Sequence, residues 1–177
     1  MNRKNFRIYI NAPITICFVL ICLLALGLDY VTNGRSTVLV FSTYGSSFLD
    51  PLSYVRMIGH IFGHAGIDHL TSNMLYILLL GPILEEKYHD RLITVIIFTA
   101  VITGVIHNLV QPNVMLLGAS GIVFAFILLA SVTGKEQGIP ITLILVAILW
   151  LGQEFYNGAR IPSHAVTNIS SGFRAQI

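Results

Sequence analysis

A serine lies between small residues at the head of an apolar stretch, where a hydroxyl contributes little to an ordinary membrane helix. Gly118, Ala119, Ser120 and Gly121 lie near the start of the apolar residues 114–132. Glycines allow other helices and a substrate backbone to approach closely, and helix amides nearby can stabilise an oxyanion. This arrangement predicts a buried nucleophile at Ser120.

A second group of polar side chains crowds the entry to another apolar stretch. It consists of His60, His64, His69 and Asn73. Polar side chains inside a membrane are costly, and they usually face a cavity or a partner. We expect His69 and Asn73 to lie at the same membrane depth as Ser120, so the two groups predict one site.

The composition of this 177-residue chain indicates that lipid is its solvent. Hydrophobic residues make up 55% of the chain and charged residues only 10%, against about 25% charged residues in a soluble domain. One domain is expected at this length. The net charge of +2 is too small to suggest a nucleic-acid partner. Cys17 and Cys22 lie in one apolar stretch and indicate nothing about the redox compartment.

Apolar stretches of about the length of a membrane span recur along the chain. We expect spans over residues 13–31, 67–84, 92–109, 114–132 and 139–155, followed by a short, weakly apolar segment over 163–177. The long region between the first two spans is expected to be a loop, partly in the outer leaflet, with Arg56 as its anchor. The predicted fold is an all-α membrane protein, a bundle of about six transmembrane helices whose last helix is short or incomplete.

Basic residues predict that the amino terminus is cytoplasmic. They precede the first span and separate the second from the third and the fourth from the fifth: Arg3, Lys4, Arg7, Lys87, Arg91 and Lys135. Such residues favour the cytoplasmic side. We therefore expect a cytoplasmic segment over 1–12 and a transmembrane domain over 13–177, in a bacterial cell membrane. Ser120 would then lie about 9 Å below the outer surface, if its helix began at Val114.

The region from about residue 56 to residue 126 resembles the rhomboid intramembrane serine proteases. Two motifs of that family are present: GxSG as Gly118-Ala119-Ser120-Gly121, and the second-helix pattern H-x4-H-x3-N as His64, His69 and Asn73. GxSG by itself is a weak signal. GxSG at the head of a span, with the histidine and asparagine motif two spans earlier, is a specific one.

The resemblance implies an intramembrane protease with a serine and histidine dyad and no cofactor. Ser120 would be the nucleophile and His164 the general base. Side chains of His69 and Asn73, with the amide of Gly118 or of Ser120, would donate hydrogen bonds to the oxyanion. The implied substrates are membrane-spanning proteins, cleaved near their outer ends.

Three further residues would support this site. They are His64, Gly121 and Phe124. In the family the position of Phe124 is often a tyrosine that packs on the base. A phenylalanine can still stack there, but it cannot donate a hydrogen bond.

The carboxy-terminal residues depart from the family pattern. The glycine expected three positions after His164 is Thr167, and a register shifted by four would place Asn168 at the position of the base. Only 13 residues follow His164, whereas a span needs about 20. The alternative function is therefore a catalytically inactive rhomboid-like protein that binds membrane clients.

Each motif also has a structural interpretation. Small residues around Ser120 are typical of close helix packing, and His69 and Asn73 suit hydrogen bonds between helices. His60 and His64 would hold the loop against the second helix. No HExxH sequence is present and no cysteine lies near the histidines, so no metal is expected. A channel or transporter is a distant third class, because no inverted repeat is visible.

Overall fold

The structure is a computed structural model that describes residues 9–47, 49–132, 140–141, 144–149 and 152. Three of its helices are long and apolar enough to cross a membrane: α1 (Pro13–Thr32), α4 (Ile67–Tyr88) and α5 (Arg91–Val110). They confirm the first three predicted spans to within a few residues. A fourth apolar helix, α6 (Ser120–Ser131), is shorter. The expected sixth segment lies outside the described residues, as does about half of the fifth span, of which residues 140–141, 144–149 and 152 are described.

The region between α1 and α4 is not the plain loop that the sequence predicted. It holds α2 (Arg35–Leu39), α3 (Pro51–Gly59) and the 3₁₀ turn η1 (His60–Phe62). Helix α3 forms because Asp50 caps its amino end, where Oδ1 accepts from the Leu52 amide at 3.0 Å, and because Pro51 suits a first helical turn. The sequence interpretation overlooked this Asp-Pro start signal.

The fourth predicted span was also wrong at its start, since α6 begins at Ser120 and not at Val114. The residues before it pair with the region between α1 and α4 instead. Thr43 and Leu116 exchange two backbone hydrogen bonds of 2.9 and 2.8 Å. These bonds satisfy the backbone without a helix. Ser120 is thus the first residue of its helix, and the depth expected from helical rise does not apply.

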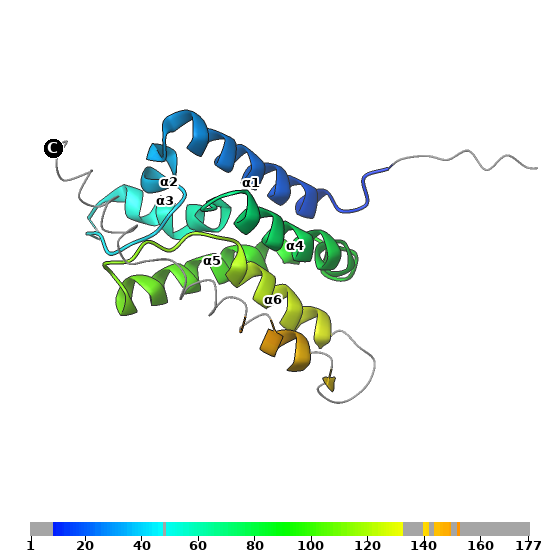
Figure 1. The fold of residues 1–177 in the computed structure, drawn as a ribbon. Helices are drawn as coiled ribbons and strands as arrows, with labels where there is room; N and C mark the ends of the chain where they lie inside the picture. The colour runs from blue at the N-terminus through cyan, green and yellow to red at the C-terminus, as the bar shows by residue number, and fades with distance from the viewer. Residues whose placement is uncertain (1–8, 48, 133–139, 142–143, 150–151, 153–177) are drawn as a thin grey trace, which may run out of the picture.

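The helices run up and down, so that α4 and α6 begin at the same end of the bundle (Figure 1). Helix α1 lies alongside α4 in the opposite direction. Gly81 of α4 allows the two helices to pack closely. A Cβ at this position would lie only 2.5 Å from Thr15 Cγ2 of α1. Bulky residues there would force the helices apart.

A buried carboxylate joins α1 to α4. Residue Ala12 gives α1 no side-chain cap. Glu85 of α4 takes that role: its two oxygens accept from the Ile14 amide at 2.8 Å, the Thr15 amide at 2.9 Å and the Thr15 hydroxyl at 2.8 Å. A negative charge at a helix amino end is stabilised by unpaired amides and by the helix dipole. These hydrogen bonds therefore offset the cost of burying the Glu85 carboxylate and the first amides of α1.

The outward faces of the long helices are apolar. Large exposed side chains include Leu24, Leu28, Leu75, Leu79, Ile97, Phe98 and Ile106. A soluble monomer rarely exposes so much apolar surface. The buried core lies between the helices and includes Cys22, Ile77, Leu84, Ile122 and Phe126. The molecule is an integral membrane protein whose exposed faces suit lipid.

We expect Glu85→Ala to lower the free energy of unfolding by about 2 kcal/mol, because the first-turn amides of α1 lose a charged acceptor. The matched control is Glu86→Ala at the exposed neighbouring position, where we expect a change close to zero. Thermal unfolding of both variants in detergent micelles, followed by circular dichroism, measures the difference. Equal midpoints for the two variants would contradict a capping role.

Candidate active site

Ser120 stands at the amino end of α6, directly after a backbone turn. Gly118 has φ +127°, a conformation that glycine adopts without strain. Ala119 is fully buried, whereas Ser120 is only partly buried. The first amides of a helix have no partner within it, and they favour negative charge nearby. A hydroxyl at this position therefore has access and a favourable electrostatic setting for nucleophilic chemistry.

The imidazole of His69 packs directly on the Gly118 backbone. A Cβ on Gly118 would lie 2.8 Å from His69 Cε1 and 2.9 Å from His69 Nε2. Only a glycine leaves room for the ring at this point. The structure thus brings the first turn of α4 to the residues that lead into Ser120, as the two motifs predicted.

One hydrogen bond determines which nitrogen of His69 carries the proton. The Ala65 amide donates to His69 Nδ1 at 3.4 Å. Since Nδ1 accepts, a neutral ring carries its hydrogen on Nε2. Nε2 is also one of the ring atoms nearest Gly118. His69 therefore presents a hydrogen-bond donor at the amino end of α6.

Asn73 lies one turn further along α4 and is buried. Its Nδ2 donates to the His69 carbonyl at 3.0 Å. An amide NH₂ has two hydrogens, and this bond uses one of them. Asn73 is thus held on the same side of α4 as His69, with a second N–H as a potential donor.

The Gly118 amide already has an acceptor, because it donates to the His60 carbonyl at 2.9 Å. Of the two amides considered from the sequence, the one at Ser120 lies in the first turn of α6. It is therefore the better placed donor for an oxyanion.

His60 ties η1 to α5, not to the second span as the sequence predicted. Its Nε2 lies 3.1 Å from the Ala100 carbonyl, an acceptor, so Nε2 carries the hydrogen. Gly104 allows this close approach of α3 and α5, since a Cβ there would lie 3.1 Å from the Met57 carbonyl oxygen. Burial lowers the pKa of His60 and keeps its ring neutral. His60 is a structural link whose carbonyl also holds Gly118.

His64 lies beside His69 and is fully buried. Its Nδ1 is 3.1 Å from the Phe62 carbonyl. The centroids of the His64 and His69 rings are 5.1 Å apart, and the ring planes meet at 65°. Burial and then the His69 ring lower the pKa of His64 to about 4. His64 is therefore neutral at physiological pH and belongs to the immediate surroundings of His69.

The other two supporting residues lie on α6. A Cβ on Gly121 would lie 3.1 Å from Thr103 Cγ2, so this glycine allows α6 to pack closely on α5. Phe124 is half-buried and packs against the core. The base expected from the resemblance, His164, lies outside the described residues, as do Thr167 and Asn168.

The region between α1 and α4 is fastened by one arginine, which confirms the anchor role predicted for Arg56. Its Nη2 bonds Asp50 Oδ2 at 2.8 Å and the hydroxyls of Ser46 and Ser53 at 3.1 and 3.2 Å. Its guanidinium carbon lies 4.8 Å from the centre of the Tyr44 ring. This network fixes the chain segment that pairs with the residues before Ser120.

Sequence reasoning missed two polar residues at the end of α5 that hold the residues before Ser120. Asn108 Nδ2 donates to Thr43 Oγ1 at 3.0 Å. His107 Nε2 lies 2.8 Å from the Val114 carbonyl. Adjacent polar residues at the end of an apolar span were the available signal.

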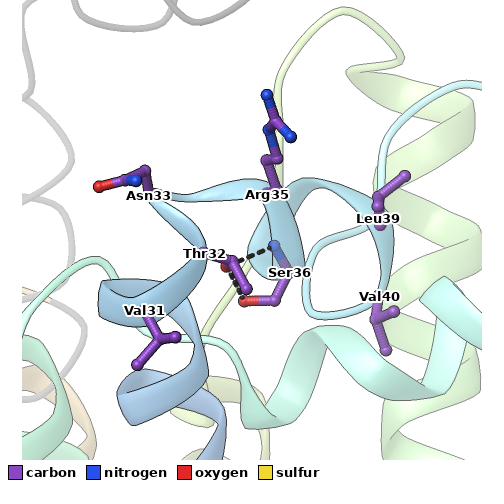
Figure 2. A pocket seen from close by; sticks show the side chains of 7 residues that line it. All are labelled: Val31, Thr32, Asn33, Arg35, Ser36, Leu39 and Val40. Carbon is purple, nitrogen blue, oxygen red and sulfur yellow. Dashed lines mark hydrogen bonds between the residues drawn. The ribbon is translucent and has the colours of Figure 1, made fainter.

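A surface hollow of about 620 Å³ lies elsewhere, at the carboxyl end of α1 (Figure 2). Its polar lining includes Thr32 and Ser36, whose hydroxyls hydrogen-bond each other at 3.0 Å, while Arg35 extends away from them. A second hollow, of about 780 Å³, lies at the other end of the bundle, and Glu85 is among the residues that line it. Neither contains Ser120 or His69. Among the described residues no group of three His, Cys, Asp or Glu side chains is arranged to hold a metal ion.

Comparison with known proteins identifies the family of the chain. A sequence model of the Rhomboid domain matches residues 51–170, which is most of the chain. The chain belongs to the rhomboid family. The matched region includes the His64, His69 and Asn73 motif, Ser120 and also His164. The resemblance seen in the sequence is thereby confirmed at the level of the family.

Three relatives of the family illustrate the similarity. The chain is 30% identical to Rhomboid-like protease 3 of Toxoplasma gondii over 68% of its length, and 33% identical to Rhomboid-related protein 1 of Caenorhabditis elegans over 54%. It is 26% identical to the Rhomboid protease GlpG of Salmonella newport over 84%. These matches cover 45%, 28% and 58% of the respective relatives. The rhomboid family to which the chain belongs therefore includes proteins named as proteases.

We expect Gly118→Ala to reduce stability by about 1–3 kcal/mol, because alanine is strained at positive φ and its methyl group would displace the His69 ring. The matched control is Gly27→Ala in α1, where a Cβ meets nothing within 4 Å. That change should leave stability the same or slightly higher. Thermal unfolding in micelles compares the two. A Gly118→Ala midpoint equal to that of the native protein would contradict the close contact.

Proposed function

We propose that this chain is an intramembrane serine protease that cleaves membrane-spanning proteins. Ser120 is the nucleophile and His164 the general base. His69, Asn73 and the Ser120 amide donate hydrogen bonds to the oxyanion. The observation that carries the proposal is the packing of His69 on Gly118, which brings a ring N–H donor to the amino end of the helix that begins at Ser120. Membership of the rhomboid family supports it.

The proposed reaction has two stages. Ser120 Oγ attacks the carbonyl carbon of the scissile peptide bond while His164 takes the hydroxyl proton. The carbonyl electron pair moves to the oxygen, and the three donors stabilise that negative charge. The C–N bond then breaks, and the protonated His164 gives its proton to the leaving amine. Water, deprotonated by His164, attacks the acyl ester, the bond from the acyl carbon to Ser120 Oγ breaks, and His164 returns the proton to Oγ.

The setting of the site suggests the class of substrate. His69 and Ser120 lie at the starts of α4 and α6, at the same end of a bundle whose outer faces are apolar. A protein substrate that reaches this site from the bilayer would be cut near one end of its span. The basic residues of the sequence favour the outer end, with residues 1–12 in the cytoplasm.

We expect Ser120→Ala to abolish both labelling by a fluorophosphonate probe and cleavage of a single-span reporter in lipid vesicles. The matched control is Ser131→Ala at the other end of α6, whose hydroxyl donates to the Ile127 carbonyl at 2.7 Å. That variant should keep its activity. His164→Ala should lower cleavage by about 10²–10⁴-fold, the usual contribution of a general base.

The same experiment tests the alternative of an inactive rhomboid-like protein. Folded native chain that neither reacts with the probe nor cleaves any reporter would favour a client-binding role. Cleavage that is independent of His164 would reject the dyad but keep Ser120 as nucleophile.

Asn73→Ala should lower kcat by about 10²–10³-fold and change KM little, because the bond to the oxyanion strengthens only as charge develops. Ser72→Ala provides the control one residue away, since the Ser72 hydroxyl donates to the His69 carbonyl at 2.9 Å without being buried. Steady-state kinetics on the reporter separates the two parameters. An unchanged kcat for Asn73→Ala would exclude its role at the oxyanion.

A further inference from the structure

The orientation of the His69 ring needs more than its own hydrogen bond. The Ala65 amide lies 3.4 Å from His69 Nδ1, beyond the 2.7–3.2 Å of ordinary N–H···O bonds in proteins. Such a bond is weak. A histidine ring at the end of a helix can also rotate about its side-chain bonds. A second contact must therefore hold the ring with Nε2 toward Gly118.

His64 supplies that contact. The two rings lie 5.1 Å apart at 65°, an edge-to-face arrangement that aromatic rings favour. His64 is only 1% exposed, so its ring is a buried surface on which the His69 ring packs.

The position of the His64 ring is itself fixed by other contacts. Nδ1 of His64 donates to the Phe62 carbonyl at 3.1 Å, since a carbonyl can only accept. The Phe62 ring packs on Phe18 of α1 with centroids 5.2 Å apart. Gly63 lies so close to the Phe41 carbonyl that a Cβ there would clash. His64 therefore stands on a segment that is held by two other parts of the chain.

We propose that His64 is a positioning residue for the oxyanion site. Its ring fixes the rotamer of His69, which keeps Nδ1 against the Ala65 amide and so keeps Nε2–H directed at the developing negative charge. Histidine combines two properties that this role needs: a ring to face His69, and an N–H to fix that ring on Phe62. The inference rests on the proposed function, because it assigns His64 a task in the same reaction.

The test separates the ring from its anchor. His64→Asn keeps an N–H near the Phe62 carbonyl but removes the ring, and we expect kcat to fall about tenfold with KM unchanged, as for a slightly misplaced catalytic group. His64→Phe keeps a ring without its anchor, and its kcat should lie between those of His64→Asn and the native protein. The control is His89→Asn, the same substitution at an exposed site at the other end of α4.

A double variant distinguishes positioning from a merely structural role. In the background of His69→Ala there is no ring left to position, so adding His64→Asn should cause no further loss of kcat. A loss that adds fully to that of His69→Ala would overturn the proposal, as would native kcat in both His64 variants.

A spectroscopic readout makes the test independent of proteolysis. Nitrogen-15 shifts of labelled histidine should show His69 in a single Nε2–H tautomer in the native protein, and in a mixture of tautomers in His64→Asn or His64→Phe. Unchanged shifts in a folded variant would overturn the positioning role. If the native chain and Ser120→Ala were equally inactive, the proposed function would fail, while the nitrogen shifts would still report on His64.

Discussion

The contact between the His69 ring and the Gly118 backbone is the constraint on which the rest of this site depends. There the His69 ring from the first turn of α4 packs directly on the backbone that leads into α6. The contact requires a glycine at position 118 for two reasons: the ring leaves no space for a Cβ, and the backbone has a φ of +127°. It also explains why the residues before Ser120 are not helical: a helix cannot contain that φ, so α6 starts after it. The amides of that start have no partner within the helix, and such donors are what an oxyanion requires.

Polar groups fix this contact from several sides. The His60 carbonyl holds the Gly118 amide, and Thr43 pairs with Leu116. The Arg56 network fastens the segment that contains Thr43. At the opposite end Glu85 ties α1 to α4. In a protein whose outer faces meet lipid, the hydrophobic effect contributes little to the association of the helices. Paired polar groups and close contacts at glycines therefore do more to determine how the helices pack.

The sequence was sufficient for the spans whose ends coincide with changes in polarity. Apolar runs of about 20 residues predicted α1, α4 and α5 because lipid demands both that length and a helix. It misjudged the region between α1 and α4, where Asp50 and Pro51 start a helix within a polar stretch. It also placed the start of α6 too early, since the apolar residues from Val114 onward pair with Thr43 instead of coiling. Hydropathy indicates which segments lie in lipid. It does not predict the starts of α3 and α6, because these are determined by hydrogen bonds.

The residue types of the site were determined by the sequence: a serine among small residues, and histidine and asparagine at helical spacing, which also indicated the family. Their working arrangement was decided only by tertiary structure. The tautomer of His69 follows from the Ala65 amide, and the engagement of the Gly118 amide follows from the His60 carbonyl. The position of the His64 ring, on which His69 packs, follows from the Phe62 carbonyl and from the Phe18 ring on α1. Spacing along one chain specifies which groups share a helix face, but it does not specify which backbone groups elsewhere donate or accept their hydrogen bonds.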